Sequence, residues 1–275
     1  MTARIRIKGL CKSFAAPVLE EVNLQIMPGR IHGLVGENGA GKSTLINIIS
    51  GLLSADAGTL ELNGQAYRAA SRPQALQQGI ALAAQELSLI DTLSVAENIF
   101  LSAFPQNFMT VDRARLRKHA EELMAQVGLH AMSAHTPVAK LALAEKQLVE
   151  MAKALSMPAD NCQLLILDEP ASALTTPQVE KLHQIFRERV ATGLSIIYVS
   201  HRLDDVLSVC DDVSVLRDGI IVSTAPTTCL TANDLITAMC GQDLLEHRES
   251  SLRQAGELRL KVDQLSSAIF PQSVS

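Results

Sequence analysis

The chain has 275 residues, 47% of them hydrophobic, with a formal net charge of −5. Its length and apolar content predict a globular protein of one large or two modest domains, not a disordered chain. The acidic balance argues against a nucleic-acid partner, which would need a basic face. No run of about 18 apolar residues exists and the first residues lack an apolar signal core, so we expect no membrane span or secretory signal.

Five scattered cysteines occur in the chain, and no two form a C-x-x-C pair. Their odd number and wide spacing are typical of reduced thiols in a cytosolic protein. They indicate no metal site.

Alternating polar and apolar residues predict strands at 4–8, 22–26 and 59–64, each with one buried face. The apolar run at 31–35 predicts a short buried strand, entered through a Pro-Gly turn. Up to about residue 85 we therefore expect an antiparallel β element joined to an α/β core.

A glycine-rich loop follows the strand at 31–35 and precedes an apolar helix at 45–49. It matches G-x-x-x-x-G-K-[ST], the phosphate-binding loop, in the strand–loop–helix context that the motif requires. An ordinary glycine-rich turn is the alternative, and that context disfavours it. The loop residues are Gly36, Glu37, Asn38, Gly39, Ala40, Gly41, Lys42, Ser43 and Thr44.

The chemistry of the loop suits a nucleoside triphosphate. Glycines without a Cβ allow several backbone N–H groups to turn toward one phosphate chain. The following helix presents the positive end of its dipole to the same anion. Lys42 can reach the β- and γ-phosphates, and the Ser43 hydroxyl can ligate Mg²⁺.

The region from 92 to 154 has a helical pattern, clearest in 113–127. One face of that segment is apolar at the spacing of a helix: Leu116, Ala120, Leu123, Met124 and Val127. Short apolar strands at 163–167 and 194–200 then flank a helix at 179–189. This alternation predicts an α/β fold with a parallel sheet covered on both faces.

Two adjacent carboxylates, Asp168 and Glu169, end the aliphatic run at 164–167. A buried strand could deliver Asp168 to Mg²⁺, commonly through a bound water, while Glu169 could polarise the attacking water as general base. Such a run is otherwise only a strand that meets a polar loop. Its place downstream of a phosphate loop favours the catalytic interpretation.

His201 and Gln85 each follow an expected strand, at 194–200 and 79–84. The alternatives are a surface histidine and a solvated glutamine. Because ligands of α/β proteins bind at the carboxyl ends of the strands, we expect His201 to reach the γ-phosphate. We expect Gln85 to sense Mg²⁺ and the attacking water.

Together these motifs, in this order, resemble the ATP-binding cassette (ABC) ATPases over residues 4–245. The resemblance implies a P-loop NTPase with a mostly parallel core sheet, an N-terminal antiparallel β subdomain and a helical subdomain at about 88–158. It also implies ATP and Mg²⁺ as cofactors. Phe14 matches the aromatic residue on which the family stacks adenine, although a core Phe is an equal alternative.

Further segments resemble the carbohydrate-importer subfamily, whose ATPase subunits carry two cassettes in one polypeptide. They are 85–90, 95–100, 147–155 and 173–175. Ribose, galactose, arabinose, xylose and autoinducer-2 importers belong to that group. The resemblance implies an ATP hydrolase that energises sugar uptake, peripheral on the cytoplasmic face of the inner membrane. Its partners would be membrane permease subunits, a second cassette and, indirectly, a periplasmic solute-binding protein, without nucleic acid.

The signature loop departs from the family pattern Leu-Ser-Gly-Gly-Gln. Residues 141–145 are Leu-Ala-Leu-Ala-Glu, so Ala142 and Ala144 replace the Ser and the second Gly that contact the γ-phosphate of the opposite cassette. A methyl group cannot donate a hydrogen bond, and a Cβ hinders backbone approach. Thr175 also stands where Asp is commoner. We therefore expect one good and one poor half-site, and slow hydrolysis by the chain alone.

Residues 257–275 echo residues 5–24, with Leu265 corresponding to Leu10 and Val274 to Val22, after a polar linker at 246–256. Unless the echo is chance, it suggests the start of a truncated second cassette, or one cassette whose partner is encoded separately. Two other functions stay open. One is a soluble ABC ATPase that acts on ribosomes or DNA. The other is a folded cassette that binds ATP but energises nothing.

Overall fold

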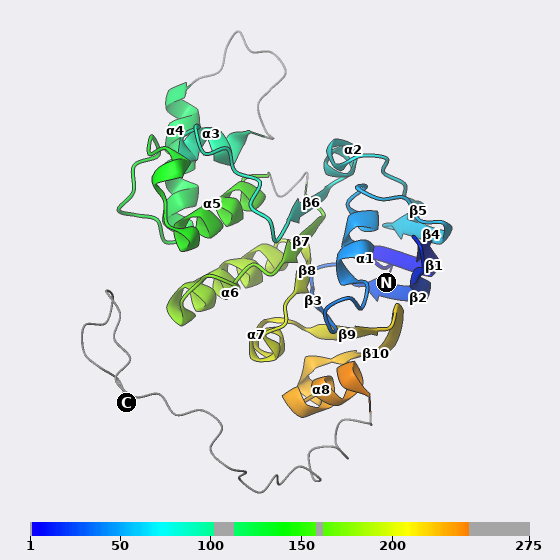
Figure 1. The fold of residues 1–275 in the computed structure, drawn as a ribbon. Coiled ribbons are helices and arrows are strands. Elements are labelled where there is room, and N and C mark those ends of the chain that lie inside the picture. Colours follow the sequence, from blue (N-terminus) through cyan, green and yellow to red (C-terminus); the bar gives the residue numbers. More distant parts are fainter. Residues whose placement is uncertain (1, 102–112, 158–161, 242–275) are drawn as a thin grey trace, which may run out of the picture. The chain divides into compact units, whose positions relative to one another are not determined.

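The computed structural model describes residues 2–101, 113–157 and 162–241 (Figure 1). All of these except Gly241 belong to one compact unit, Met1–Cys240. The expected linker at 246–256 and the expected second-cassette segment at 257–275 lie outside the described residues.

A four-stranded antiparallel sheet occupies the N-terminal part, in the order β2-β1-β4-β5. Its strands are β1 (Ile5–Ser13), β2 (Pro17–Ile26), β4 (Ala57–Leu62) and β5 (Gln65–Ala66). The alternation predicted for 4–8 and 22–26 is confirmed, because Ile5, Ile7 and Leu24 are buried. Strand β1 runs five residues beyond its predicted end, since Leu10 resumes pairing with Val22 after an irregularity at Gly9.

A six-stranded sheet has the order β10-β9-β3-β8-β7-β6. Its strands are β3 (Ile31–Val35), β6 (Ile80–Ala83), β7 (Leu164–Asp168), β8 (Ser195–Val199), β9 (Asp212–Arg217) and β10 (Ile220–Pro226). All neighbours pair in parallel except β9 and β10. The prediction of a mostly parallel sheet is therefore confirmed.

Eight α-helices are found in the described part of the chain. They are α1 (Lys42–Ile49), α2 (Arg72–Gln77), α3 (Val95–Phe100), α4 (Arg113–Gln126), α5 (Leu143–Leu155), α6 (Thr176–Ala191), α7 (Leu203–Val209) and α8 (Ala232–Cys240), with short 3₁₀ helices at Val138–Lys140 and Thr227–Cys229. Helix α6 begins three residues before its predicted start. Thr175 is its N-cap and donates its backbone N–H to the Gln178 side chain, and a proline occupies the first turn. None of these helices is both long and apolar enough to cross a membrane.

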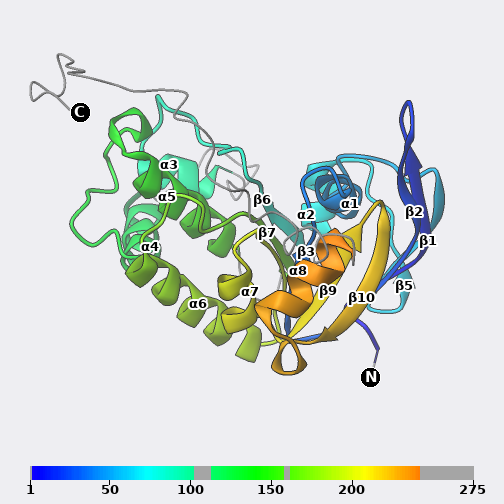
Figure 2. The same ribbon diagram turned by 60° about the horizontal axis from the view of Figure 1, so that its bottom comes forward.

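The strand periodicity of two sends alternate side chains of the six-stranded sheet into two cores. Leu34, Ile166 and Ile197 pack with α1 and the antiparallel sheet on one face. Ile196 and Tyr198 pack with α6 and α7 on the opposite face. The layers can be followed in Figures 1 and 2, where α6 and α7 lie across the sheet from α1.

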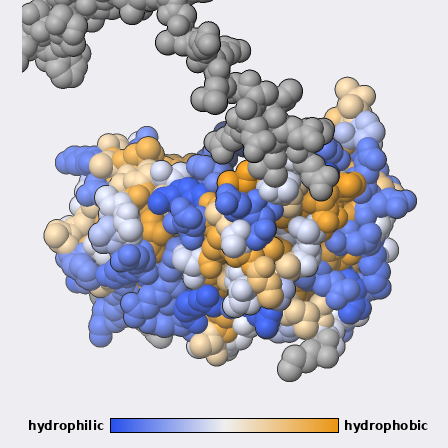
Figure 3. Space-filling model, turned by 90° about the horizontal axis from the view of Figure 1, so that it is seen from below, coloured by the Kyte–Doolittle hydropathy of each residue, from blue (hydrophilic) through white to orange (hydrophobic). Residues whose placement is uncertain are grey.

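Helices α3, α4 and α5 pack on one another beside the β6 end of the sheet (Figure 1). The helical face predicted for 113–127 is confirmed, since Ala120, Leu123 and Met124 are buried in this group. On the outside, Ile220 and Ile236 are among the large hydrophobic side chains that stay exposed. Figure 3 shows hydrophilic and hydrophobic residues interspersed over one face.

Candidate nucleotide site

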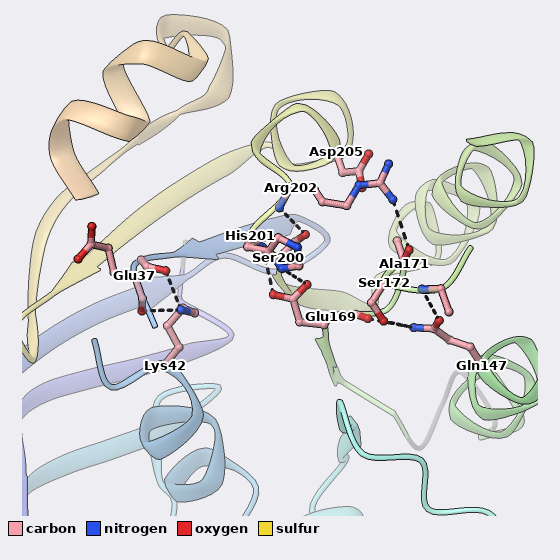
Figure 4. Close-up of polar contacts among 12 residues, drawn as sticks. Glu37, Lys42, Gln147, Glu169, Ala171, Ser172, Ser200, His201, Arg202 and Asp205 are labelled. Carbon is pink, nitrogen blue, oxygen red and sulfur yellow. Dashed lines mark hydrogen bonds and ion pairs between the residues drawn. The ribbon is translucent and has the colours of Figure 1, made fainter. Parts of the chain in front are cut away.

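Three loops that carry the predicted site residues meet at one edge of the six-stranded sheet. Strand β8 lies between β3 and β7, and all three run parallel, so their carboxyl ends are neighbours. Residues 36–44 follow β3, Asp168 ends β7, and His201 lies just beyond β8. Figure 4 shows Lys42, Glu169 and His201 side by side at this edge.

The glycines of the loop have different roles. A Cβ on Gly36 would lie 2.2 Å from the Leu216 carbonyl oxygen, and one on Gly41 would lie 2.9 Å from that of Val18. These two glycines are therefore needed for packing against β9 and β2. Gly39 has a φ of 88°, a conformation that favours glycine, and no atom lies within 4 Å of the place that a Cβ would take.

Lys42 begins helix α1 and folds back over its own loop. Its Nζ donates to the carbonyl oxygens of Gly36, at 2.6 Å, and Glu37, at 2.9 Å (Figure 4). Burial lowers the pKa of Lys42, against the opposing influence of Glu169 and Asp168. Ser43 beside it is exposed. The ammonium group is thus held by two carbonyl groups of its own loop.

Asp168 is a half-buried carboxyl at the end of β7. Burial raises its pKa, the neighbouring Glu169 raises it further, and Lys42 lowers it. No cluster of three or more His, Cys, Asp or Glu that could hold a metal is found in the described ranges. Mg²⁺ commonly uses one or two carboxylates, waters and substrate phosphates, so Asp168 with the Ser43 hydroxyl fits that donor set.

Glu169 and His201 are joined by two contacts. The His201 Nδ1 lies 2.9 Å from Glu169 Oε2, and the His201 backbone N–H donates to Glu169 Oε1 at 3.0 Å (Figure 4). The Glu169 side chain is only 11% exposed, whereas that of His201 is 66% exposed. The imidazole therefore presents itself to solvent while it holds the carboxylate.

Gln85 and Phe14 lie away from these contacts. Gln85 follows β6, the outer strand next to β7, and is exposed. Phe14 lies in the turn between β1 and β2, is 61% exposed, and has the Lys12 ammonium 5.5 Å from its ring centroid. The alternative of a core Phe is wrong.

The signature residues form the start of helix α5. Leu141 is buried, and Ala142 is the N-cap, with its N–H donated to Glu145 Oε2 at 2.8 Å. Ala142 has no side-chain oxygen to cap the helix in return. Leu143, the first helical residue, is 64% exposed.

Two further residues hold the loop after Glu169, and sequence reasoning had missed both. Gln147 on α5 bonds to Glu169, Ser172 and Ala173. Arg202 donates to the Ala171 carbonyl oxygen at 3.3 Å and pairs with Asp205 (Figure 4). The sequence contains no clear signal for Gln147, which directly follows two other polar residues, Glu145 and Lys146.

A glycine-rich loop between β3 and α1, with acidic residues at the end of another parallel strand of the same sheet, defines the class of P-loop nucleotide-binding α/β proteins. The profile of one family, described as ABC transporter, matches residues 19–172, more than half of the chain. The chain belongs to the ABC transporter family.

Curated relatives extend this result. The chain is 37% identical, over 96% of its length, to the ribose import ATP-binding protein RbsA of Chromobacterium violaceum. It is 36% identical, over 97% of its length, to the galactose/methyl galactoside import ATP-binding protein MglA of Treponema denticola. It covers 52% and 53% of these proteins, so the chain spans about half the length of the curated relatives it matches.

Solved structures agree on the fold. A nucleotide-free ATP-binding cassette from an ABC transporter superposes with a TM-score of 0.72 at 22% identity, covering 90% of this chain and 98% of that one. CbiO1 from Clostridium perfringens, part of the ABC transporter complex cbiONQ, gives 0.71 at 22% identity, covering 90% and 100%. At this identity the likeness concerns the fold alone.

Proposed function

We propose that the chain is the ATP-binding and ATP-hydrolysing part of an importer for a sugar or sugar-like solute. The observation that carries the proposal is the Glu169–His201 pair, held beside the Lys42 loop at one sheet edge. The solute class is supported by relatives named as ribose and galactose import proteins. The cassette would extend over 4–245, with the helical subdomain at about 88–158.

In this proposal residues 36–44 hold the triphosphate. Lys42 exchanges two neutral carbonyl partners for phosphate oxygens, which form stronger charge-assisted hydrogen bonds. The exposed Phe14 ring stacks on adenine. Ser43 and Asp168 would hold a magnesium ion and Gln85 would sense it, and the ion would supply neutralising charge on the phosphate oxygens.

Glu169 is the general base of the proposed reaction. Its carboxylate accepts the proton of the water that attacks the γ-phosphate. His201 keeps that carboxylate in place through two contacts, and its exposed ring is available to the phosphate. Lys42 balances the charge of the phosphates.

The site over Lys42 would be completed by the signature residues of a second cassette. Ala142 and Ala144 would offer that second cassette few hydrogen-bond donors in return. Membrane permease subunits would contact the Gln85 loop and the helical subdomain, through which the conformational change driven by ATP would reach them. A solute-binding protein would act indirectly. The chain would lie peripherally on the cytoplasmic face of the inner membrane.

Glu169→Gln tests the catalytic role. Because an amide cannot accept the proton, we expect ATP binding by calorimetry to be retained while single-turnover hydrolysis falls by about 10²–10⁴-fold. Lys146→Ala, which removes a surface pair with Asp91, is the matched control and should match the wild type. Unchanged hydrolysis by Glu169→Gln would refute the assignment.

Fractionation of cells tests the transport role. The tagged chain should sediment with membranes and co-purify with permease subunits, because the proposed stroke ends there. Recovery with ribosomes or DNA instead would favour a non-transport ABC ATPase.

A further inference from the structure

Gln147 is a buried amide on a helix whose other buried side chains are mostly apolar. It is 7% exposed and lies one turn after Leu143, the first residue of α5. Its Nε2 donates to the Glu169 carbonyl oxygen at 3.0 Å and to Ser172 Oγ at 3.1 Å. Its Oε1 accepts the Ala173 N–H at 2.9 Å. Both ends of the amide are therefore committed to the segment after β7 (Figure 4).

The segment that Gln147 holds includes an unusual backbone conformation. Glu169 has a φ of 53°, in the left-handed region that a non-glycine residue occupies only when its surroundings impose it. Its N–H donates to the Val199 carbonyl oxygen of β8 at 2.9 Å, so the sheet fixes one side of the residue. Its carbonyl on the other side receives the Gln147 amide. The direction of the Glu169 carboxylate thus depends on both contacts.

We propose that Gln147 is a positioning residue, which keeps Glu169 in this conformation and its carboxylate against His201. The proposal rests on the proposed function, in which Glu169 is the base. It also links two parts of the molecule, since the helix that begins at the signature residues ends its first turn at Gln147. A displacement of α5 would break the hydrogen bond from Gln147 to the Glu169 carbonyl oxygen.

Two substitutions separate the contacts. Gln147→Met keeps the length of the side chain and removes every hydrogen bond, whereas Gln147→Glu keeps an acceptor for the Ala173 N–H and loses both donors. We expect single-turnover hydrolysis by both variants to fall about 10²-fold, because small misplacements of a reacting group have effects of that size. ATP affinity should not change, since Gln147 does not contact the loop at 36–44. Lys146→Met, on the neighbouring residue, should match the wild type.

A double-mutant cycle distinguishes positioning from general support of the fold. If Gln147 acts through Glu169, adding Gln147→Met to Glu169→Gln should lower the residual hydrolysis no further. A structural role would lower both backgrounds by the same factor. Equal losses, or wild-type hydrolysis by Gln147→Met, would overturn the proposal.

Amide hydrogen exchange tests the contact of Gln147 directly and does not depend on ATP hydrolysis. The Ala173 amide should exchange faster in Gln147→Met and keep its protection in Gln147→Glu and Lys146→Met. Unchanged protection in Gln147→Met would overturn the proposal whatever the activity. If the wild-type chain hydrolyses no ATP, the proposed function fails separately, and the exchange data alone decide whether Gln147 holds this segment.

Discussion

The sheet edge around Lys42 and the signature residues 141–145 at the start of α5 are both parts of the expected ATPase site, yet they are built differently. At the sheet edge several polar groups have partners: Lys42 bonds to its own loop, the Glu169 carboxylate to His201, and the Glu169 carbonyl oxygen to Gln147 of α5. At the start of α5, Ala142 has no capping side chain and Leu143 is largely exposed. The first region is organised in the isolated chain, whereas the second offers an apolar surface with few donors.

The comparison shows where the chemistry resides in this chain. Charge and hydrogen bonding accumulate where several strands end together, because parallel strands bring distant residues to one edge. A single helix start has only its own first turn to supply such groups. The following substitutions test this difference, in order of decreasing effect.

Lys42→Ala removes the charge at the centre of the first region. Loss of one partner from a desolvated charge pair costs roughly 2–5 kcal/mol, so ATP should bind about 30-fold more weakly or worse. Calorimetric titration with ATP and Mg²⁺ measures the effect. Lys146→Ala, on the residue after the signature, should leave the affinity unchanged. Equal losses in both variants would show that the effect is not specific to Lys42.

His32 lies in β3, the strand that precedes the phosphate loop, and its titration should make the stability of the fold depend on pH. Burial lowers the pKa of His32 to about 4, against a raising influence of Asp212, and its Nε2 lies 2.8 Å from Ser214 Oγ. The unfolded chain, with an ordinary pKa of 6.5, takes up the proton first as the pH falls. The free energy of unfolding should therefore fall between pH 6.5 and 4, by on the order of 3 kcal/mol from this group.

Urea unfolding of the wild type and His32→Gln at pH 7.5 and 5.0 checks this expectation. The variant should lose less stability between the two pH values, since it lacks the titrating ring. Identical losses would show that other groups carry the pH dependence.

Phe14→Ala tests the proposed adenine contact. Base–aromatic stacking contributes about 1–3 kcal/mol, so ATP affinity should fall roughly 10-fold. Because Phe14 is 61% exposed, the fold should be unaffected. Inorganic triphosphate serves as the control ligand, and a parallel loss of its affinity would argue against stacking.

Ala142→Ser adds a capping hydroxyl at the start of α5, where Ala142 has none. The new hydroxyl could accept the Glu145 N–H and complete a reciprocal cap, which should raise the free energy of unfolding by about 1 kcal/mol. Helix α3 has that complete arrangement at Ser94 and Glu97, so Ser94→Ala should lower stability by a similar amount. No change from Ala142→Ser in urea unfolding would contradict the expected cap.

Much of the site could be predicted because its residues are marked by local patterns. The strand–loop–helix at 31–49 and the aliphatic run into Asp168 and Glu169 can each be identified within one short segment of the chain. Adjacent strand ends then followed from one intervening helix, and the pairing of β7 with β8 confirms it. The roles assigned to Gln85, Asp168 and His201 stay predictions.

The amino-acid sequence was enough to predict the strands that lead into the site, the phosphate loop and the weak signature, because periodicity and motif chemistry act over short segments. The tertiary structure was needed to show which glycines serve packing, that Phe14 is exposed, and that Gln147 reaches the backbone of Glu169. Those facts depend on residues far apart in the chain, such as Gly36 with Leu216 or Gln147 with Glu169. Contacts of that kind leave no local pattern, since the folded sheet alone brings the partners together.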